Sequence, residues 1–171
     1  MKISLSLLIT ALFALTTVGL SLADSDKNHK RYKHPRQLAV SSTAPQIWKD
    51  ECSSCHMLYP PGLLPGAAWQ QQMDTLEDHY GSNASLEAQE YQEILDYLLR
   101  ASAHNHLPLE PSPTSGEAPR ISQTRWFEHE HDEISEARFQ RESVGGRFNC
   151  VACHRNAEQG DFDDDDVKIP R

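Results

Sequence analysis

Apolar and polar residues alternate with the periodicity of an α-helix in two central segments of the chain. In residues 66–80 the large apolar side chains recur at intervals of four, three and four residues, as they do on one face of a helix. These positions are Trp69, Met73, Leu76 and Tyr80. Gly81 follows and is a typical helix terminator. The pattern therefore predicts one amphipathic helix from Gly66 to Tyr80.

Residues 86–101 are predicted to form a second amphipathic helix. Ser85 is suited to cap its first turn, where the carboxylate of Glu87 would interact favourably with the positive end of the helix dipole. The apolar stripe that we expect to be buried consists of Tyr91, Ile94, Leu95 and Leu98.

The rest of the chain predicts shorter helices and no strand. A short helix is expected over residues 45–51, with Trp48 on its buried side, and the segment 59–65, YPPGLLP, would end any helix. Residues 121–134, ISQTRWFEHEHDEI, predict a further helix, and a shorter one is expected from Ser135. Because no segment alternates polar and apolar residues with a period of two, we expect an all-α fold.

The N-terminal residues 1–23 are predicted to be a cleaved secretory signal. Lys2 precedes an apolar run, and Ser21 and Ala23 provide small residues at the positions that a signal peptidase inspects. An uncleaved membrane anchor is the alternative, since the run approaches the roughly 20 residues that span a bilayer. The polar residues in the run and the Ser-Leu-Ala site favour cleavage. No other segment is apolar enough to cross a membrane, so we expect a periplasmic protein.

Composition divides the remaining chain into segments. Residues 24–44 are polar and aperiodic, which predicts a flexible lead-in. Residues 106–119 contain four prolines and are predicted to link two lobes. The N-terminal lobe would be residues 45–105, and the C-terminal lobe would be residues 120–171 with an acidic tail.

The chain is acidic, with a formal net charge of −9. This charge argues against a nucleic-acid partner and favours a partner with a basic protein surface, because complementary fields raise encounter rates. The run Asp161–Asp166 concentrates the negative charge. It is either a solvated tail or a docking patch close to His154.

All four cysteines lie in two motifs of the form Cys-X-X-Cys-His, which are Cys52-Ser-Ser-Cys55-His56 and Cys150-Val-Ala-Cys153-His154. The motif is the signature of c-type haem attachment. Each thiol can form a thioether with a haem vinyl group, and the adjacent histidine can bind the iron from one side. Two disulfides, or one zinc site with four thiolates, are the alternatives, but neither explains the two histidines. A redox dithiol would need a βαβ context, which the pattern does not show. We therefore predict two covalently bound haem c groups, with His56 and His154 as iron ligands.

Each iron also needs a sixth ligand or keeps an open face. His79 is the candidate in the first lobe, because it lies three residues after Leu76 on the predicted apolar stripe, where a buried imidazole requires a partner. The alternative is that His79 interacts only with the C-terminal dipole of its helix. In the second lobe His129 and His131 are both candidates, and periodicity does not separate them. His29, His34, His104 and His106 are expected to be solvated.

Methionine is the other common sixth ligand. Met73 shares a helix face with His79, but packing in the core is the better interpretation. Met57 directly follows His56 and cannot reach across the same ring. The C-terminal half contains no methionine, so the second haem lacks a methionine ligand from its own lobe. Because His/Met ligation raises the reduction potential, two bis-histidine haems should have low potentials. Two filled coordination positions would leave no place for a substrate, which predicts an electron carrier and not an enzyme.

The sequence resembles the dihaem cytochrome c family of bacteria. The resemblance is carried by residues 51–65 (ECSSCHMLYPPGLLP), residues 69–86 (W…DHYG…ASL), residues 120–134 (RI…WF…EHDEI), and residues 149–162 (NCVACHRNAEQGDF) with the closing VKIPR. It covers nearly the whole chain after the predicted signal. Ser135, where relatives often have proline, and the region around His104 and His106 depart from the pattern.

The resemblance implies an α-helical fold of two small lobes, each packed around one covalent haem with two histidine ligands. The matching positions give His79 and His131 as the distal ligands, which favours His131 over His129. They do not fix which distal histidine serves which haem. The resemblance also implies electron transfer to a small oxygen-binding monohaem cytochrome, often alongside a membrane b-type cytochrome. The alternatives are an electron-transfer subunit of a periplasmic reductase and a haem enzyme of the peroxidase type, which would need an open iron position.

Overall fold

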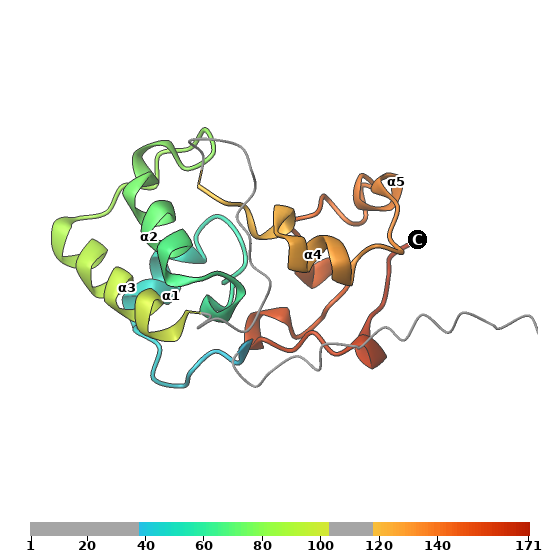
Figure 1. Ribbon diagram of the computed structural model, residues 1–171, viewed down its shortest axis with the longest axis horizontal. Coiled ribbons are helices and arrows are strands. Elements are labelled where there is room, and N and C mark those ends of the chain that lie inside the picture. The colour runs from blue at the N-terminus through green and yellow to red at the C-terminus, as the bar shows by residue number, and fades with distance from the viewer. Residues whose placement is uncertain (1–37, 103–117) are drawn as a thin grey trace, which may run out of the picture. The chain divides into compact units, whose positions relative to one another are not determined.

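The computed structural model describes residues 38–102 and 118–171 (Figure 1). Within these two ranges the chain forms five α-helices, joined by turns and 3₁₀ helices, and contains no strand. An isolated β-bridge joins His79 and Ser82. The predicted all-α fold is thus confirmed for the described residues. The expected signal, most of the expected lead-in and residues 103–117 lie outside them.

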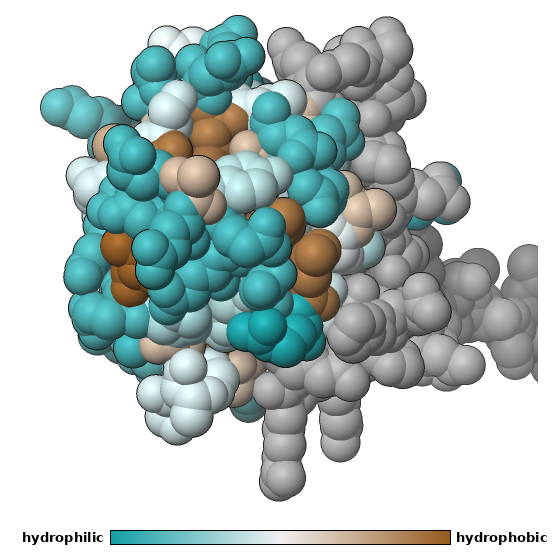
Figure 2. Space-filling model, turned by 90° about the vertical axis from the view of Figure 1, so that its left-hand side faces the viewer, coloured by the Kyte–Doolittle hydropathy of each residue, from teal (hydrophilic) through white to brown (hydrophobic). Residues whose placement is uncertain are grey.

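The five α-helices follow the order of the predicted segments. They are α1 (Gln46–Cys52), α2 (Gly66–Asp74), α3 (Ala88–Ala101), α4 (Arg125–Glu130) and α5 (Glu136–Phe139). Helix α3 packs against α2 and α1, and Figure 1 shows these three helices as one group. The face of this group in Figure 2 is mostly hydrophilic, with small separate apolar areas, so the apolar stripe of α3 is turned inward.

Helix α2 is shorter than the single helix predicted for residues 66–80. It ends at Asp74, and the chain continues in a 3₁₀ turn, Leu76–Asp78. Thr75 leaves the helical conformation, with φ −116° and ψ 20°. Its hydroxyl donates a hydrogen bond of 2.9 Å to the carbonyl of Gln71. Threonine hydroxyls compete in this way with regular helix bonds, which explains why the helix stops although the apolar spacing continues.

Helix α3 begins slightly later than predicted and has a different cap. Glu87, and not Ser85, is the N-cap residue, and it forms a capping box with Glu90. The amide of Glu87 donates to the carboxylate of Glu90 at 3.2 Å. The buried residues of α3 are Ile94, Leu95, Tyr97 and Leu98. Tyr91, which we expected on the buried stripe, is only half-buried.

The helix predicted for residues 121–134 is divided. A 3₁₀ turn, Ile121–Gln123, comes first, and α4 starts after it with Thr124 as N-cap. The Thr124 hydroxyl accepts a hydrogen bond of 3.2 Å from the amide of Phe127 and donates one of 2.8 Å to the carbonyl of Ile121. Helix α5 confirms the shorter helix expected after Ser135.

Two clusters of buried side chains form the interior. The first consists of Ala44, Trp48, Met73, Ile94, Leu95, Tyr97 and Leu98. The second consists of Leu38, Leu63, Trp126, Phe127, Phe139, Val144, Ala157 and Phe162. Leu63 belongs to the predicted N-terminal lobe but packs in the cluster of the C-terminal lobe. The two clusters therefore do not divide the chain strictly at its predicted linker.

The flexible lead-in predicted for residues 24–44 does not extend to its last residues. Leu38 is 1% exposed and packs in the second cluster, and Ala44 is buried in the first. The prediction was wrong for these two residues, because a polar and aperiodic composition does not reveal single apolar anchors. Ala118 and Pro119, at the end of the predicted linker, are buried as well.

Candidate functional site

The first Cys-X-X-Cys-His motif starts at the end of α1. Trp48 anchors this helix, since its buried ring lies 4.9 Å from the ring of Tyr97. Cys52 is the last residue of α1 and is half-buried, whereas Cys55 is exposed in the following turn. Burial raises the pKa of Cys52 to about 11, so its thiol stays protonated at neutral pH.

His56 is oriented by its neighbours in the chain. Its Nδ1 lies 2.7 Å from the carbonyl oxygen of Met57. A carbonyl can only accept, so Nδ1 carries the hydrogen and Nε2 is left as a basic nitrogen. The ring centre of His56 lies 5.0 Å from that of Tyr59 and 6.2 Å from that of His79.

His79 lies beyond α2 and not on its apolar stripe. The backbone places it, because its amide donates to the carbonyl of Ser82 at 2.7 Å and its carbonyl accepts from Ser82 at 3.2 Å. Its Nδ1 is buried and has no hydrogen-bond partner among the described residues. Burial lowers the pKa of His79, and the nearby charges of His56 and Arg120 lower it further. The lowered pKa favours the neutral form of the imidazole that lies next to His56.

The second motif begins in a 3₁₀ turn, Cys150–Ala152. The amide of His154 donates to the carbonyl of Cys150 at 2.8 Å, and the amide of Lys168 donates to the carbonyl of Cys153 at 3.0 Å. These bonds fix the motif to the C-terminal residues. Burial raises the pKa of Cys150 to about 11, so this thiol also stays protonated. All four cysteines are free thiols, which does not support the disulfide alternative.

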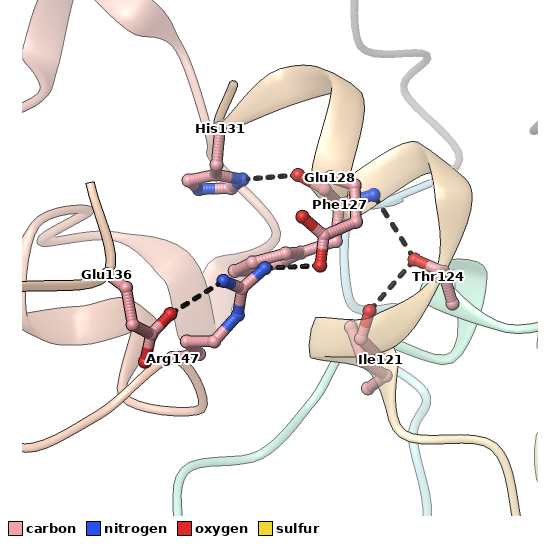
Figure 3. Close-up of polar contacts among 7 residues, drawn as sticks. All are labelled: Ile121, Thr124, Phe127, Glu128, His131, Glu136 and Arg147. Atoms are coloured by element: carbon pink, nitrogen blue, oxygen red, sulfur yellow. Dashed lines mark hydrogen bonds and ion pairs between the residues drawn. The ribbon is translucent and has the colours of Figure 1, made fainter. Parts of the chain in front are cut away.

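His131 follows directly on α4 (Figure 3). Its Nδ1 lies 2.9 Å from the carbonyl oxygen of Phe127, and its ring stacks on the Phe127 ring at 4.1 Å. The ring centres of His131 and His154 are 6.1 Å apart. His129, the other candidate, is exposed. Burial lowers the pKa of His131, although its hydrogen bond to Phe127 opposes this shift.

Each histidine pair lines a cavity. The pair His56 and His79 lines a cavity of about 670 Å³, within the range of cofactor sites. The pair His131 and His154 lines a cavity of only about 60 Å³. All eight predicted site residues line one or both cavities; they are Cys52, Cys55, His56, His79, His131, Cys150, Cys153 and His154. The side chains that line both cavities include Phe127 and Arg147.

Several residues around these sites were not predicted. Tyr59, Tyr80, Arg120 and Arg147 all line the larger cavity. Arg147 pairs with the carboxylates of Glu128 and Glu136 (Figure 3), the second at 3.0 Å. No spacing rule marks these residues, since each acts through contacts that are distant in sequence.

Within residues 38–102 and 118–171, no three histidine, cysteine or acidic side chains gather in a group that could hold a metal ion. The donors instead form opposed histidine pairs, each with thiols beside it. None of the described helices has the length and apolarity that a membrane span requires.

The chain is similar in sequence and in structure to known dihaem cytochromes c. The model of the dihaem cytochrome c family matches residues 48–162. The diheme cytochrome c of Shewanella baltica OS155 is 36% identical, with a TM-score of 0.63 over 73% of this chain and 92% of that chain. The diheme cytochrome c of Rhodobacter sphaeroides is 35% identical, with a TM-score of 0.59 over 70% of this chain and 98% of that chain. No match is found among the curated proteins. Because the family model spans both attachment motifs and both histidine pairs, the chain belongs to the dihaem cytochrome c family.

Proposed function

We propose that this protein is a periplasmic electron carrier whose two haem irons are each bound by two histidines. His56 and His79 would bind the first iron, and His154 and His131 the second. The family carries two covalently bound c-type haems and transfers electrons without acting as an enzyme. A haem supplies an iron that takes up and releases one electron, and the protein provides its attachment, its ligands and its surroundings.

The separation of the ring centres carries this proposal. A metal–nitrogen bond to histidine is about 2 Å long, and the nitrogen lies about 1.1 Å from its ring centre, so two histidines on opposite sides of one metal have ring centres about 6 Å apart. The observed separations are 6.2 Å for His56 and His79 and 6.1 Å for His131 and His154. On this pairing each distal histidine would serve the haem attached to the motif of its own lobe, a choice that the sequence left open.

The hydrogen bonds of the rings support the same assignment. Histidines that bind metals usually donate their other ring N–H to a carbonyl or carboxylate, which fixes the ring and increases its basicity. Nδ1 of His56 makes this bond to Met57, and Nδ1 of His131 makes it to Phe127. In both residues Nε2 is the nitrogen left for iron.

Two histidine ligands per iron would give low reduction potentials and leave no open coordination position. Met73 is the one methionine that could compete with His79, since it lines the larger cavity, but it is buried in the first hydrophobic cluster.

Electron paramagnetic resonance of the oxidised holoprotein tests the ligands. The wild type should contain two haems per chain, both low-spin. His79→Ala and His131→Ala should each convert one haem to the high-spin form, whereas the exposed His129→Ala and the methionine variant Met73→Leu should leave both low-spin. If His79→Ala and His131→Ala keep two low-spin haems, the assignment is wrong.

The periplasmic location is proposed from the predicted signal of residues 1–23. Mass spectrometry of the holoprotein from the periplasmic fraction should give a chain that begins at Asp24. A chain that retains Met1 and sediments with membranes would contradict the proposal and favour the membrane anchor.

We also propose that the protein passes electrons to a small oxygen-binding monohaem cytochrome, or exchanges them with a membrane b-type cytochrome, through a basic surface of the partner. The exposed aspartates 163–166 follow Phe162, whose ring lies 5.3 Å from that of His154. Negative charge therefore lies close to the second haem site. Stopped-flow mixing with such a cytochrome should show a transfer rate that falls as salt is raised, and replacing these aspartates with asparagine should remove most of the salt dependence. A rate that does not depend on salt would argue against this docking.

A further inference from the structure

Both distal histidines have an aromatic ring beside them and an arginine on that ring. In the first lobe the ring centre of Tyr80 lies 4.8 Å from that of His79, and the guanidinium carbon of Arg120 lies 3.7 Å from the Tyr80 ring centre. In the second lobe Phe127 stacks on His131 at 4.1 Å, and the guanidinium carbon of Arg147 lies 5.1 Å from the Phe127 ring centre. The same order of cation, ring and imidazole thus occurs twice, with different residues.

Hydrogen bonds hold Tyr80 in its position between His79 and Arg120. The Tyr80 hydroxyl donates a hydrogen bond of 3.0 Å to the carbonyl of Ala118, two residues before Arg120. The buried amide of Gln72 donates to the Tyr80 oxygen at 2.7 Å and to the carbonyl of Pro119 at 2.8 Å. Tyr80 has a positive φ of 55°, a left-handed backbone conformation that is unfavourable for a non-glycine residue. Three contacts therefore keep Tyr80 strained between His79 and Arg120.

The two arginines differ in whether a carboxylate pairs with the guanidinium group. Arg147 forms ion pairs with Glu128 and Glu136, and the three side chains are visible together in Figure 3. Arg120 has no carboxylate partner among the residues that the structure describes. It is half-buried and lines the larger cavity, where Tyr80 covers one face of its guanidinium.

We propose that Arg120 and Arg147 are positioning residues that raise the reduction potentials of the first and second haem respectively, and that Arg120 has the stronger effect because no carboxylate among the described residues pairs with it. This inference rests on the proposed bis-histidine ligation. Each ferric iron accepts one electron from a donor redox protein and passes it on, and no bond forms or breaks.

The sign follows from electrostatics. The ferric state carries one more positive charge than the ferrous state, so a fixed cation nearby destabilises the ferric state and raises the potential. These contacts place each guanidinium within about 10 Å of its distal imidazole, a distance at which salt screens a partly buried charge only weakly. At an effective dielectric constant of about 20, unit charges about 10 Å apart change an equilibrium constant about tenfold.

A redox titration of the holoprotein monitored by electron paramagnetic resonance tests the proposal. The two low-spin signals are first assigned with the His79→Ala and His131→Ala variants. Arg120→Gln should then lower the midpoint potential of the first haem. The expected shift corresponds to about a tenfold change in the equilibrium constant for its reduction, and the midpoint potential of the second haem should change less. Arg120→Lys should keep most of the wild-type midpoint. Arg100→Gln, an exposed arginine on α3 that lines neither cavity, is the matched control and should change neither midpoint.

The ion pairs of Arg147 in the second lobe allow an independent test of the same electrostatic effect. Replacing both Glu128 and Glu136 with glutamine removes the compensation of Arg147 and should raise the midpoint of the second haem. Glu142→Gln, an exposed glutamate outside both cavities, is the control for loss of negative charge. Arg147→Gln should lower the second midpoint by less than Arg120→Gln lowers the first.

The outcomes separate the two levels of inference. If the wild type lacks two low-spin haems, the proposed ligation itself fails. If both haems are low-spin but Arg120→Gln and the double glutamine variant shift no more than their controls, the electrostatic role is wrong. It is also wrong if Arg120→Lys shifts the midpoint as far as Arg120→Gln, because stacking and not charge would then matter. If Arg120→Gln does not assemble with haem, Arg120→Lys and the variant with both Glu128→Gln and Glu136→Gln still test the electrostatic role.

Discussion

The hydroxyl of Tyr59 donates a hydrogen bond of 2.8 Å to the carbonyl oxygen of Phe148. Tyr59 follows the first attachment motif by three residues, and Phe148 precedes the second motif by two. The ring of Tyr59 also contacts that of His56. The bond therefore joins the two attachment segments directly, and both residues line the larger cavity.

Replacing Tyr59 with phenylalanine should lower the free energy of unfolding of the holoprotein by about 1 kcal/mol, because the bond is lost while the ring is kept. Denaturant unfolding followed by circular dichroism measures the change. An unchanged midpoint would show that the bond contributes nothing to joining the two segments.

Tyr97 provides the opposite case. Its hydroxyl is buried and has no hydrogen-bond partner among the described residues. Tyr97→Phe should therefore leave the holoprotein as stable as before, or stabilise it by up to about 1 kcal/mol, since a buried unsatisfied hydroxyl is costly. Measured in the same denaturant series, a loss of more than about 1 kcal/mol would mean that this hydroxyl has a partner in the holoprotein.

Thr124 is important because α4 positions both Phe127 and His131. Thr124→Ala removes the N-cap and should destabilise the protein by about 1 kcal/mol, whereas Thr124→Ser keeps the hydroxyl and should lose less. Thermal unfolding distinguishes the two variants. Equal losses in both would show that the methyl group of this buried threonine, and not its cap, is what stabilises the region.

Sequence patterns predicted the helical segments better than their ends. The apolar spacing through Leu76 and Tyr80 predicted one long helix, yet Thr75 ends α2 and the two residues lie beyond it. Periodicity records which side chains face the interior, and a turn can pack the half-buried Leu76 against the first cluster as well as a helix can. Glu87 replaced Ser85 as the cap for a similar reason, since Glu90 was available for a reciprocal bond.

Site residues could be predicted from the sequence where they belong to a short continuous motif. The two motifs are complete in five residues each, so the thiols and the adjacent histidines could be read directly. The pairing of His79 with His56 required the structure, because it depends on the bridge between His79 and Ser82. Arg120 could not be predicted either, because its role depends on a contact with Tyr80, forty residues earlier.

Gly160 allows the chain to pass close to the backbone of Leu38. Its φ is +80°, and a Cβ at this position would lie 1.9 Å from the carbonyl oxygen of Leu38. Gly160→Ala should therefore destabilise the holoprotein by several kcal/mol, or about 3 kcal/mol in order of magnitude. Gly81→Ala is the matched control, because Gly81 also has positive φ, +92°, but meets nothing within 4 Å. It should cost only about 1 kcal/mol, and equal melting temperatures for the two variants would contradict the close approach.

Asp74, at the end of α2, provides a prediction for pH dependence. Its carboxylate accepts a hydrogen bond of 2.7 Å from the hydroxyl of Tyr91 and one of 2.8 Å from Gln70, and these bonds lower the pKa of Asp74. A carboxyl with a lowered pKa in the folded state stabilises the fold above its ordinary pKa of about 4, and this contribution is lost as the pH falls through the lowered value. Tyr91→Phe should therefore be less stable than the wild type near neutral pH, and the difference should shrink as the solution is acidified below about pH 4. Thermal unfolding from neutral pH downward measures this difference. In Asp74→Asn, which cannot titrate, the same tyrosine substitution should have an effect that does not change with pH, and a pH-dependent effect in that background would show that another group is responsible.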